Sequence, residues 1–489
     1  MKKISFYIIL AFATALTSCV SLDEEPRSNV ASNQFFETTS DANASVVSVY
    51  NALSHNSSGD HASIYNRLLT LTVGMSTDDH IAGPRATNPD VRSLAALTQS
   101  ASNDRYSQLW KQLYDGINRA NIAVDHIPSI QGDTATTNRL VREAKFLRAL
   151  YYFNLVRLWG DVPLVLHETT SLKDLSVARA PLADVYTQIL SDLSDAEKLP
   201  KKFTGVNVFR ATSGAAKTLE LNVYVTRQQW ANAITKYNEI QNGGFGYDLF
   251  TNFADVFNTA TENGKEHIFS VQYIADGAGN LTGSGNTNIR GIISAPYAIF
   301  GADADAPHAS LISAYNAAVD KRYPTTFYTT ITSPYDGLVK TFTPHFKKYY
   351  DPTSGTNLIN SGINVPILRY AEVVLFYAEA QNELTGPGDA SDASSAYTAI
   401  NKIRNRAGIS NLTTGLSKDQ FRDSLYLERR REFAYEDIRW FDLIRTKRLV
   451  TELKKYTDKV NVSDKNYLLA IPTHEISLNP KLTQNPGWE

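Results

Sequence analysis

Apolar residues recur three and four positions apart along most of this 489-residue chain, which is the period of an amphipathic helix. The pattern predicts helices over residues 41–53, 107–127, 138–159 and 181–199. Asp41 is a suitable N-terminal cap for the first helix. Gly160, followed by Pro163, ends the third. The chain is therefore predicted to be mainly α-helical.

Two segments place a pair of such helices around a short turn. Residues 211–242 carry two patterned helices that flank the polar turn 226–228. Residues 369–408 repeat the arrangement around the turn residues 385–388. A helical hairpin of roughly 34 residues is the unit of tetratricopeptide repeats. These degenerate hairpins predict a superhelical scaffold of tetratricopeptide-like helical hairpins.

Residues 246–364 lack a long helical period and are rich in Tyr, Pro and Asn. They contain a strand-like run at 267–273, a short helical run at 309–319 and a glycine-rich stretch at 277–285. Long irregular segments of a compact protein are commonly functional or disordered. We interpret this part as an irregular, loop-rich ligand-binding insertion that rests on the helices.

The beginning of the chain has the form of an export signal. Two lysines precede an apolar run at 4–16, which is shorter than the roughly 20 residues that span a bilayer. This combination predicts a secretory signal peptide over residues 1–18. Leu-Thr-Ser-Cys at 16–19 resembles a bacterial lipobox, in which cleavage precedes the cysteine and the thiol carries diacylglycerol. We predict lipidation of Cys19; the alternative is a secreted protein with an incidental cysteine.

The residues after Cys19 indicate how such an anchor would be used. Residues 19–33 are polar and include the acidic run Asp23-Glu24-Glu25, which predicts a flexible tether. One acyl chain gives only marginal membrane binding, so a multiply acylated Cys19 would be needed for stable attachment. The remaining residues, 34–489, contain no further stretch of transmembrane length. We predict a single domain, residues 34–489, held at a membrane through lipid.

Composition excludes several kinds of site. Cys19 is the only cysteine, so the chain can form neither an internal disulfide nor a CxxC zinc or redox site. The nine histidines form no HxxxH pair, which argues against zinc. A net charge of −2 argues against a general nucleic-acid binder. We expect no cofactor, although a structural calcium ion held by loop Asp and Asn oxygens is an alternative.

Long motifs fill the last third of the chain. Residues 366–384 read PILRYAEVVLFYAEAQNEL, and 400–408 read INKIRNRAG. The motifs ERRREFAYE at 428–436 and RWFDLIR at 439–445 follow. The N-terminal half adds LWGDVP at 158–163. In this order, and over nearly the whole chain after Cys19, these motifs resemble the SusD/RagB family of outer-membrane nutrient-binding lipoproteins of Bacteroidetes.

The resemblance implies a fold and a function. Members are monomeric α-helical proteins in which tetratricopeptide-like hairpins support an irregular ligand-binding region. They face the cell exterior on the outer membrane, as a lid over a TonB-dependent transporter of the SusC kind. They bind oligosaccharides, or in some cases peptides, and have no catalytic activity. We therefore expect a SusC-like transporter and an oligosaccharide as partners, with a peptide or glycopeptide as the alternative ligand.

The family motifs themselves are expected to serve the scaffold. In 428–436, acids and arginines stand three or four residues apart, a spacing that places them on one helix face. Partly buried forks between an arginine and a carboxylate would stabilise the fold more than exposed pairs. The expected partners are Arg429, Arg439 or Arg445 with Glu372, Glu379 or Asp442.

A sugar offers C–H faces that stack on aromatic rings and hydroxyl groups that bond to polar side chains. The polar segment that begins at residue 77 and the insertion supply both kinds of group. The predicted ligand contacts are Asp78, Asp79, His80, Arg85, Tyr273, Asn286, Tyr297, Phe300 and Tyr335. Each aromatic could instead pack in the core, and the two aspartates could instead belong to a helix end or turn. The loop 81–98 has no aromatic residue, which favours a small site or a peptide-like ligand.

Other classes of function are less well supported. A glycoside hydrolase needs two carboxylates across a cleft, but the recognisable acids accompany arginines and no GxSxG motif is present. The glycine-rich stretch at 277–285 is not a GxGxxG phosphate loop. A purely protein-binding scaffold is a further alternative, because tetratricopeptide proteins usually have that role. Exposure of Tyr297, Phe300 and Tyr335 distinguishes a ligand surface from core packing.

Overall fold

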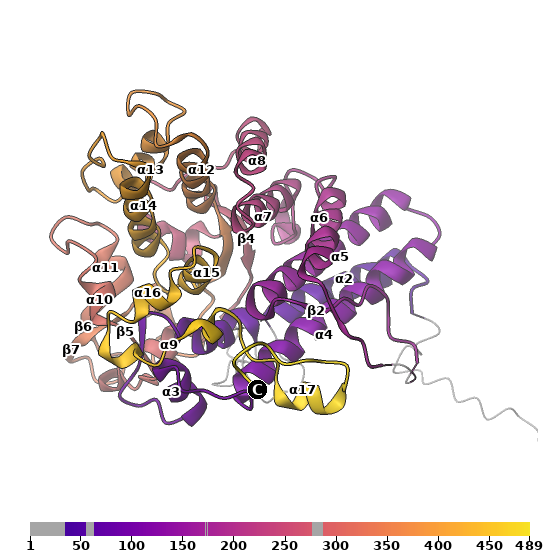
Figure 1. The fold of residues 1–489 in the computed structure, drawn as a ribbon, viewed down its shortest axis with the longest axis horizontal. Helices are drawn as coiled ribbons and strands as arrows, with labels where there is room; N and C mark the ends of the chain where they lie inside the picture. The colour runs from indigo at the N-terminus through magenta and orange to yellow at the C-terminus, as the bar shows by residue number, and fades with distance from the viewer. Residues whose placement is uncertain (1–34, 55–62, 172, 174, 276–286) are drawn as a thin grey trace, which may run out of the picture.

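The computed structural model describes residues 35–54, 63–171, 173, 175–275 and 287–489. Helices dominate, and the few strands are short (Figure 1). The predicted signal peptide 1–18, the lipidation site Cys19, the tether 19–33, the glycine-rich stretch and Asn286 lie outside the described residues. Among the described residues, no helix combines the length and the apolar character needed to cross a bilayer.

The first group of helices surrounds α5. Its members are α2 (Thr39–Ser54), α4 (Asp104–His126), α5 (Thr134–Trp159) and α6 (Leu182–Ala196). They pack side by side (Figure 1). Asp133 caps α5 by accepting a hydrogen bond from the Thr136 N–H at 3.0 Å. Arg148 of α5 donates two hydrogen bonds of 2.8 Å to Asp192 of α6, which fixes these two helices against each other.

The second group contains the predicted hairpins. Its helices are α7 (Ser213–Thr226), α8 (Trp230–Asn242), α12 (Tyr370–Thr385), α13 (Ala396–Arg406), α14 (Lys418–Glu432), α15 (Arg439–Arg445) and α16 (Leu449–Leu453). Helix α7 packs on α8, and α12 packs on α8, α13 and α14. Tyr237 of α8 stacks on Tyr377 of α12 with ring centroids 4.0 Å apart. The mainly α-helical class is confirmed, and both hairpins lie where the sequence predicted them.

Among the described residues, the strands form four antiparallel pairs. They are β1 (His80–Ala82) with β5 (Asp305–Pro307), β2 (Val162–Pro163) with β3 (Arg179–Ala180), β4 (His267–Val271) with β8 (Val365–Arg369), and β6 (Phe327–Thr332) with β7 (Val339–Phe346). The predicted strand at 267–273 is confirmed as β4. Pairing of β4 with β8 brings the two ends of the insertion together beside α12.

Several short helices complete the chain. The α-helical ones are α3 (Pro89–Ala96), α9 (Arg290–Ser294), α10 (Ala309–Ile312), α11 (Tyr323–Thr326) and α17 (Thr473–Leu478). The π-helical turns are η2 (Ile64–Leu68) and η3 (Thr70–Gly74). The 3₁₀ turns are η4 (Ile127–Ser129), η5 (Gly205–Asn207), η6 (Phe253–Phe257), η7 (Thr259–Thr261), η8 (Tyr297–Ile299), η9 (Pro352–Ser354), η10 (Thr457–Lys459) and η11 (Asp464–Tyr467).

Two local predictions were wrong. The segment 81–98 is not a plain loop, because it contains α3, whose cap Asn88 accepts hydrogen bonds from the N–H groups of Asp90 and Val91 at 2.9 and 3.2 Å. The helix predicted at 309–319 ends at Ile312. Both segments are short, so packing decides their structure more than periodicity does.

Buried ion pairs tie the insertion to the scaffold. Arg369, at the end of β8, lies 2.7–2.9 Å from carboxylate oxygens of Glu266, Glu432 and Glu436. Arg322 of the insertion lies 2.7 Å from Glu428 of α14. All of these side chains are buried, so the charges of the insertion and of α14 neutralise one another inside the core.

The scaffold role predicted for the family motifs is largely confirmed. Arg429 donates hydrogen bonds to Asp442 at 2.8 Å and to Glu372 at 3.1 Å. Arg445 contacts Glu379 and Asp442. The prediction was wrong for Arg439, whose carboxylate partner is Asp78.

Candidate functional site

Four of the predicted ligand contacts lie together on the surface of the insertion. Tyr297, Phe300 and Tyr335 are 52%, 62% and 44% exposed. The rings of Phe300 and Tyr335 have centroids 4.4 Å apart at an angle of 53°. The exposed Arg85 places its guanidinium carbon 3.9 Å from the centroid of the Tyr297 ring. We call these four side chains the aromatic surface.

A tight turn sets the positions of two of the rings. Turn η8 begins after Pro296, and the N–H of Phe300 donates to the carbonyl of Tyr297 at 2.8 Å. Phe300 has a φ of 61°, in the left-handed region that non-glycine residues seldom adopt. The next residue, Gly301, donates its N–H to the carbonyl of Pro296 at 3.1 Å. The turn therefore closes on itself and presents Tyr297 and Phe300 together.

Hydrogen bonds also fix the two other members of the aromatic surface. The N–H of Arg85 donates to the carbonyl of Asp303 at 3.0 Å, and the N–H of Gly83 donates to that of Ala304 at 3.0 Å. Tyr335 lies between β6 and β7, and its hydroxyl donates to the carbonyl of Thr356 at 2.6 Å. The backbone of Arg85 is thus held next to the residues that follow the turn, and the Tyr335 ring is held at its hydroxyl end.

The chemistry of the aromatic surface suits a ligand with both apolar faces and polar edges. Aromatic rings offer flat apolar area, and a guanidinium offers several N–H donors. Asp303, the carboxylate of the same turn, is only 7% exposed and lies 3.0 Å from the Nε2 of His345. Its burial removes it from direct contact with a molecule lying on the rings.

Asp78 and Asp79 were wrongly predicted as ligand contacts. Both are buried, and Asp78 accepts two hydrogen bonds of 2.9 and 2.8 Å from Arg439. Asp79 accepts one of 2.6 Å from Arg430. Burial by itself would raise the pKa of Asp78, but Arg439 and Arg430 hold that pKa well below its usual range. These carboxylates neutralise scaffold arginines and have no free lone pair directed at solvent.

His80 and Tyr273 were also wrongly predicted. His80 is 3% exposed because β1 pairs with β5, and its Nδ1 lies 2.8 Å from Asp305. Burial would lower the pKa of His80, but Asp305 raises it above the usual value. Tyr273 is 4% exposed and packs in the main core.

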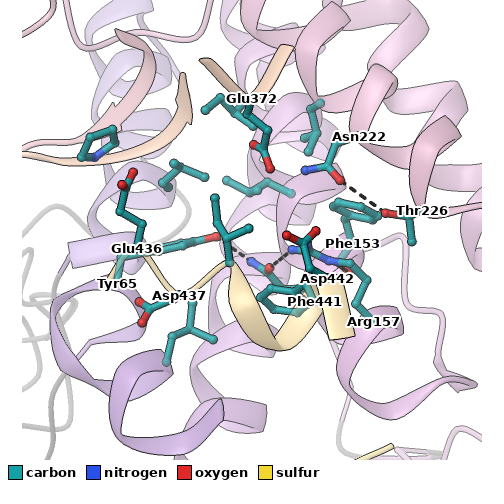
Figure 2. Close-up of a pocket in the computed structure, with 18 of the residues that line it drawn as sticks. Tyr65, Phe153, Arg157, Asn222, Thr226, Glu372, Glu436, Asp437, Phe441 and Asp442 are labelled. Atoms are coloured by element: carbon teal, nitrogen blue, oxygen red, sulfur yellow. Dashed lines mark hydrogen bonds between the residues drawn. The ribbon is translucent and has the colours of Figure 1, made fainter. Parts of the chain in front are cut away.

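An internal cavity between the two helix groups was not predicted from the sequence. It has a volume of about 60 Å³ and lies among α5, α7, α12 and α15, with Tyr65, Asn222 and Glu372 around it (Figure 2). Burial raises the pKa of Glu372, although Arg429 opposes the shift. A few water molecules would fill such a volume, which is too small for a sugar. The signal for this cavity that the sequence does contain is the presence of two polar residues, Asn154 and Asn222, in otherwise apolar stripes of helices.

The part of the chain that the structure describes holds no group of three or more His, Asp or Glu side chains that could bind a metal ion. The calcium alternative stays untested, because the glycine-rich stretch lies outside that part.

Comparisons with known proteins agree with the motifs. Residues 325–488 match the model described as the SusD family, and residues 21–225 match one described as starch-binding associating with outer membrane. SusD-like protein P2 of Formosa agariphila is 30% identical over 526 residues, covering 100% of both chains.

Solved structures show the same fold. A SusD superfamily protein of Bacteroides vulgatus has a TM-score of 0.80 at 24% identity, covering 93% of this chain and 100% of that one. Surface glycan-binding protein A of Bacteroides thetaiotaomicron, in complex with laminarihexaose, has a TM-score of 0.76 at 22% identity, covering 91% and 98%. The full-length similarity to SusD-like protein P2, together with the two matched models, shows that this chain belongs to the SusD family.

Proposed function

We propose that this protein captures oligosaccharides outside the cell on its aromatic surface and binds them without catalysis. The observation that carries the proposal is the joint exposure of Tyr297, Phe300 and Tyr335 beside the Arg85 guanidinium. Large aromatic side chains grouped on a surface commonly mark binding sites. The complex of surface glycan-binding protein A with laminarihexaose supports a glycan as the ligand class.

Exposure to solvent distinguishes this surface from an aromatic pair in the core. Aromatic residues such as Phe346 and Tyr435 stack with centroids 4.3 Å apart inside the core. Phe300 and Tyr335 make a similarly close contact but remain open to solvent. Covering their outer faces with the C–H face of a sugar would remove apolar area from water, and Arg85 would donate to hydroxyl oxygens.

Replacing Phe300 by alanine is expected to weaken oligosaccharide binding by roughly tenfold or more, because a stacking ring at a binding site contributes on the order of 1–2 kcal/mol. Affinity electrophoresis against a polysaccharide panel identifies the ligand, and calorimetry then measures the affinity of both proteins. Phe300 is exposed, so the melting temperature should change little.

Phe245→Ala is the matched control, because Phe245 is a half-buried loop aromatic that stacks on Tyr247, away from the aromatic surface. If Phe300→Ala bound oligosaccharide normally and Phe245→Ala lost affinity, the binding site would lie away from the aromatic surface. Release of shorter sugars during incubation would contradict the binding-only proposal. Binding of peptides without binding of glycans would show that the ligand is a peptide and not an oligosaccharide.

The proposal extends to delivery: the protein passes its ligand to a SusC-like TonB-dependent transporter and is held at the outer membrane by lipid on Cys19. Family membership and the lipobox-like sequence at 16–19 support this part. When cells are fractionated, a Cys19→Ala variant is expected to be lost from the membrane fraction. The purified variant is expected to bind ligand as before. Undiminished membrane retention in the fractionation would show that the lipid is not the anchor.

A further inference from the structure

A pocket of about 280 Å³ lies between the two helix groups, away from the aromatic surface and with no lining residue in common with it. Helices α5, α6 and α15, the turn between α7 and α8, and the segment around Tyr467 form its walls. Four cationic side chains line it: Arg157, Arg227, Arg445 and Lys447. No Asp or Glu is among its lining residues. The charged groups among the described lining residues are therefore all cations, of which Arg445 is neutralised by Glu379 and Asp442.

Arg157 is the central cation of this pocket. Its guanidinium carbon lies 3.9 Å from the centroid of the Phe153 ring and 3.8 Å from that of Phe441, and Figure 2 shows it beside both rings. Its hydrogen bonds go to neutral groups, the carbonyl of Phe153 at 3.2 Å and the Oδ1 of Asn154 at 2.6 Å. Burial lowers the pKa of Arg157 to about 10. Within the described residues this guanidinium forms no direct ion pair, and the more distant carboxylate of Glu372 only partly opposes the fall in its pKa.

The neighbouring arginine, Arg445, differs from Arg157 because it has carboxylate partners. Arg445 lines the same pocket, but its charge is neutralised by Glu379 and Asp442. A largely enclosed charge is costly unless an opposite charge accompanies it. Arg157 of α5 therefore lacks the carboxylate contact that buried guanidiniums of the second helix group, such as those of Arg429 and Arg445, possess.

Two further cations stand at the rim. Arg227 and Lys447 are exposed, and neither forms an ion pair within the described part of the chain. The Arg227 guanidinium lies 4.9 Å from the Tyr186 ring, and the Lys447 Nζ lies 5.0 Å from the Tyr467 ring. Lys447 has a φ of 56°, and so does Gln228, next to Arg227. Both residues directly follow the C-terminal cap of a helix, α7 or α15, where left-handed backbone commonly closes the last turn. These two helix ends therefore set the positions of Arg227 and Lys447.

We propose that this pocket binds a small molecule through an anionic carboxylate, sulfate or phosphate group. Arg157 faces the anion from the floor, and Arg227 and Lys447 approach it from the rim. The guanidinium can donate two parallel hydrogen bonds to such a group. The volume is at the lower end of the range for small-molecule sites, so the ligand is a free oxyanion or a single acidic sugar rather than a polymer.

Thermal unfolding and calorimetry of the purified protein test the proposal. The probes are sodium sulfate, sodium phosphate and sodium glucuronate, with glucose and with sodium chloride at matched ionic strength as references. Binding to the folded state alone raises the melting temperature. We expect at least one oxyanion to raise it, and glucose to have no effect. Glucuronate binding more tightly than sulfate and phosphate identifies an acidic sugar; equal or tighter binding of the inorganic ions identifies a free oxyanion.

Substitutions distinguish anion binding in this pocket from a general attraction of anions to positive charge on the protein surface. Arg157→Gln is expected to weaken anion binding by roughly tenfold or more, because charge-assisted hydrogen bonds are lost. Arg227→Gln, at the exposed rim, should keep the fold and weaken binding to a smaller degree. Lys202→Gln is the matched control, because it removes one exposed positive charge outside this pocket.

Three results would overturn the proposal: no anion-dependent stabilisation, stabilisation that persists in both arginine variants, or equal weakening in Lys202→Gln. The inference does not rest on the proposed glycan capture. Phe300→Ala should leave anion binding unchanged, so failure of one proposal is distinguishable from failure of the other.

Discussion

Replacing Arg369 by alanine is expected to lower the free energy of unfolding by about 3–5 kcal/mol, the cost of removing one partner from a buried ion pair. Arg369 is 2% exposed and lies 2.7–2.9 Å from oxygens of Glu266, Glu432 and Glu436. It also donates to the carbonyl of Glu432 at 2.9 Å. Its removal would leave buried carboxylates with fewer compensating charges at the point where β8 meets α14.

Urea unfolding at neutral pH measures this loss, provided that the transition is two-state in both proteins. Arg448→Ala is the matched control. Arg448 forms an ion pair with the exposed Asp423, and such surface pairs contribute about 0–1 kcal/mol. A loss in Arg369→Ala that is no larger than the loss in Arg448→Ala would show that the buried pairs do not hold the insertion on the scaffold.

Replacing Gly301 by alanine is expected to weaken ligand binding at the aromatic surface by roughly tenfold or more, comparable to deleting the Phe300 ring. A Cβ on Gly301 would lie 2.0 Å from the carbonyl oxygen of Ala295 and 2.3 Å from its carbonyl carbon. Backbone cannot yield as a flexible side chain does, so the turn must open. Tyr297 and Phe300 would then lose their shared orientation.

The same calorimetric titration as for Phe300→Ala measures this effect, and urea unfolding measures the accompanying strain, about 1–3 kcal/mol for an overpacked site. Gly74→Ala is a suitable control, because its added Cβ would meet its nearest neighbours at 3.6 Å, an ordinary contact distance. Full affinity in a folded Gly301→Ala variant would mean that the turn geometry does not determine the binding site.

The helices could be predicted from the sequence because their information is local. The apolar period and the stop at Gly160 placed α2 and α5 within a few residues of their observed bounds. The cap predicted at Asp41 was wrong, because Asp41 lies in the first turn of α2, where its Oδ2 accepts a hydrogen bond of 2.8 Å from the Thr38 N–H. Helix α3 was missed although Asn88 and Pro89 form a cap followed by a first-turn proline. The apolar stripe of α3 covers only about two turns, which is too short for the helical period to be recognised in the sequence.

The site was predictable only in part, because exposure depends on contacts between distant segments. Tyr273 and Tyr297 look alike in the sequence, yet one packs in the core and the other is half exposed. His80 became buried through pairing of β1 with β5. The internal cavity and the cationic pocket bring together helices from both halves of the chain, and no motif at a single place in the sequence records them.

The pairing of Asp78 with Arg439 has a consequence for the order in which the chain folds. The two residues are separated by 361 positions, and Asp78 is fully buried. A growing chain that has reached only the first helices cannot bury this carboxylate without leaving its charge unmatched. The segment around Asp78 therefore completes its folding only after nearly the whole chain has been delivered, and contacts of such long range slow folding. Until then, the segment around Asp78 lacks the ion pair that its burial requires.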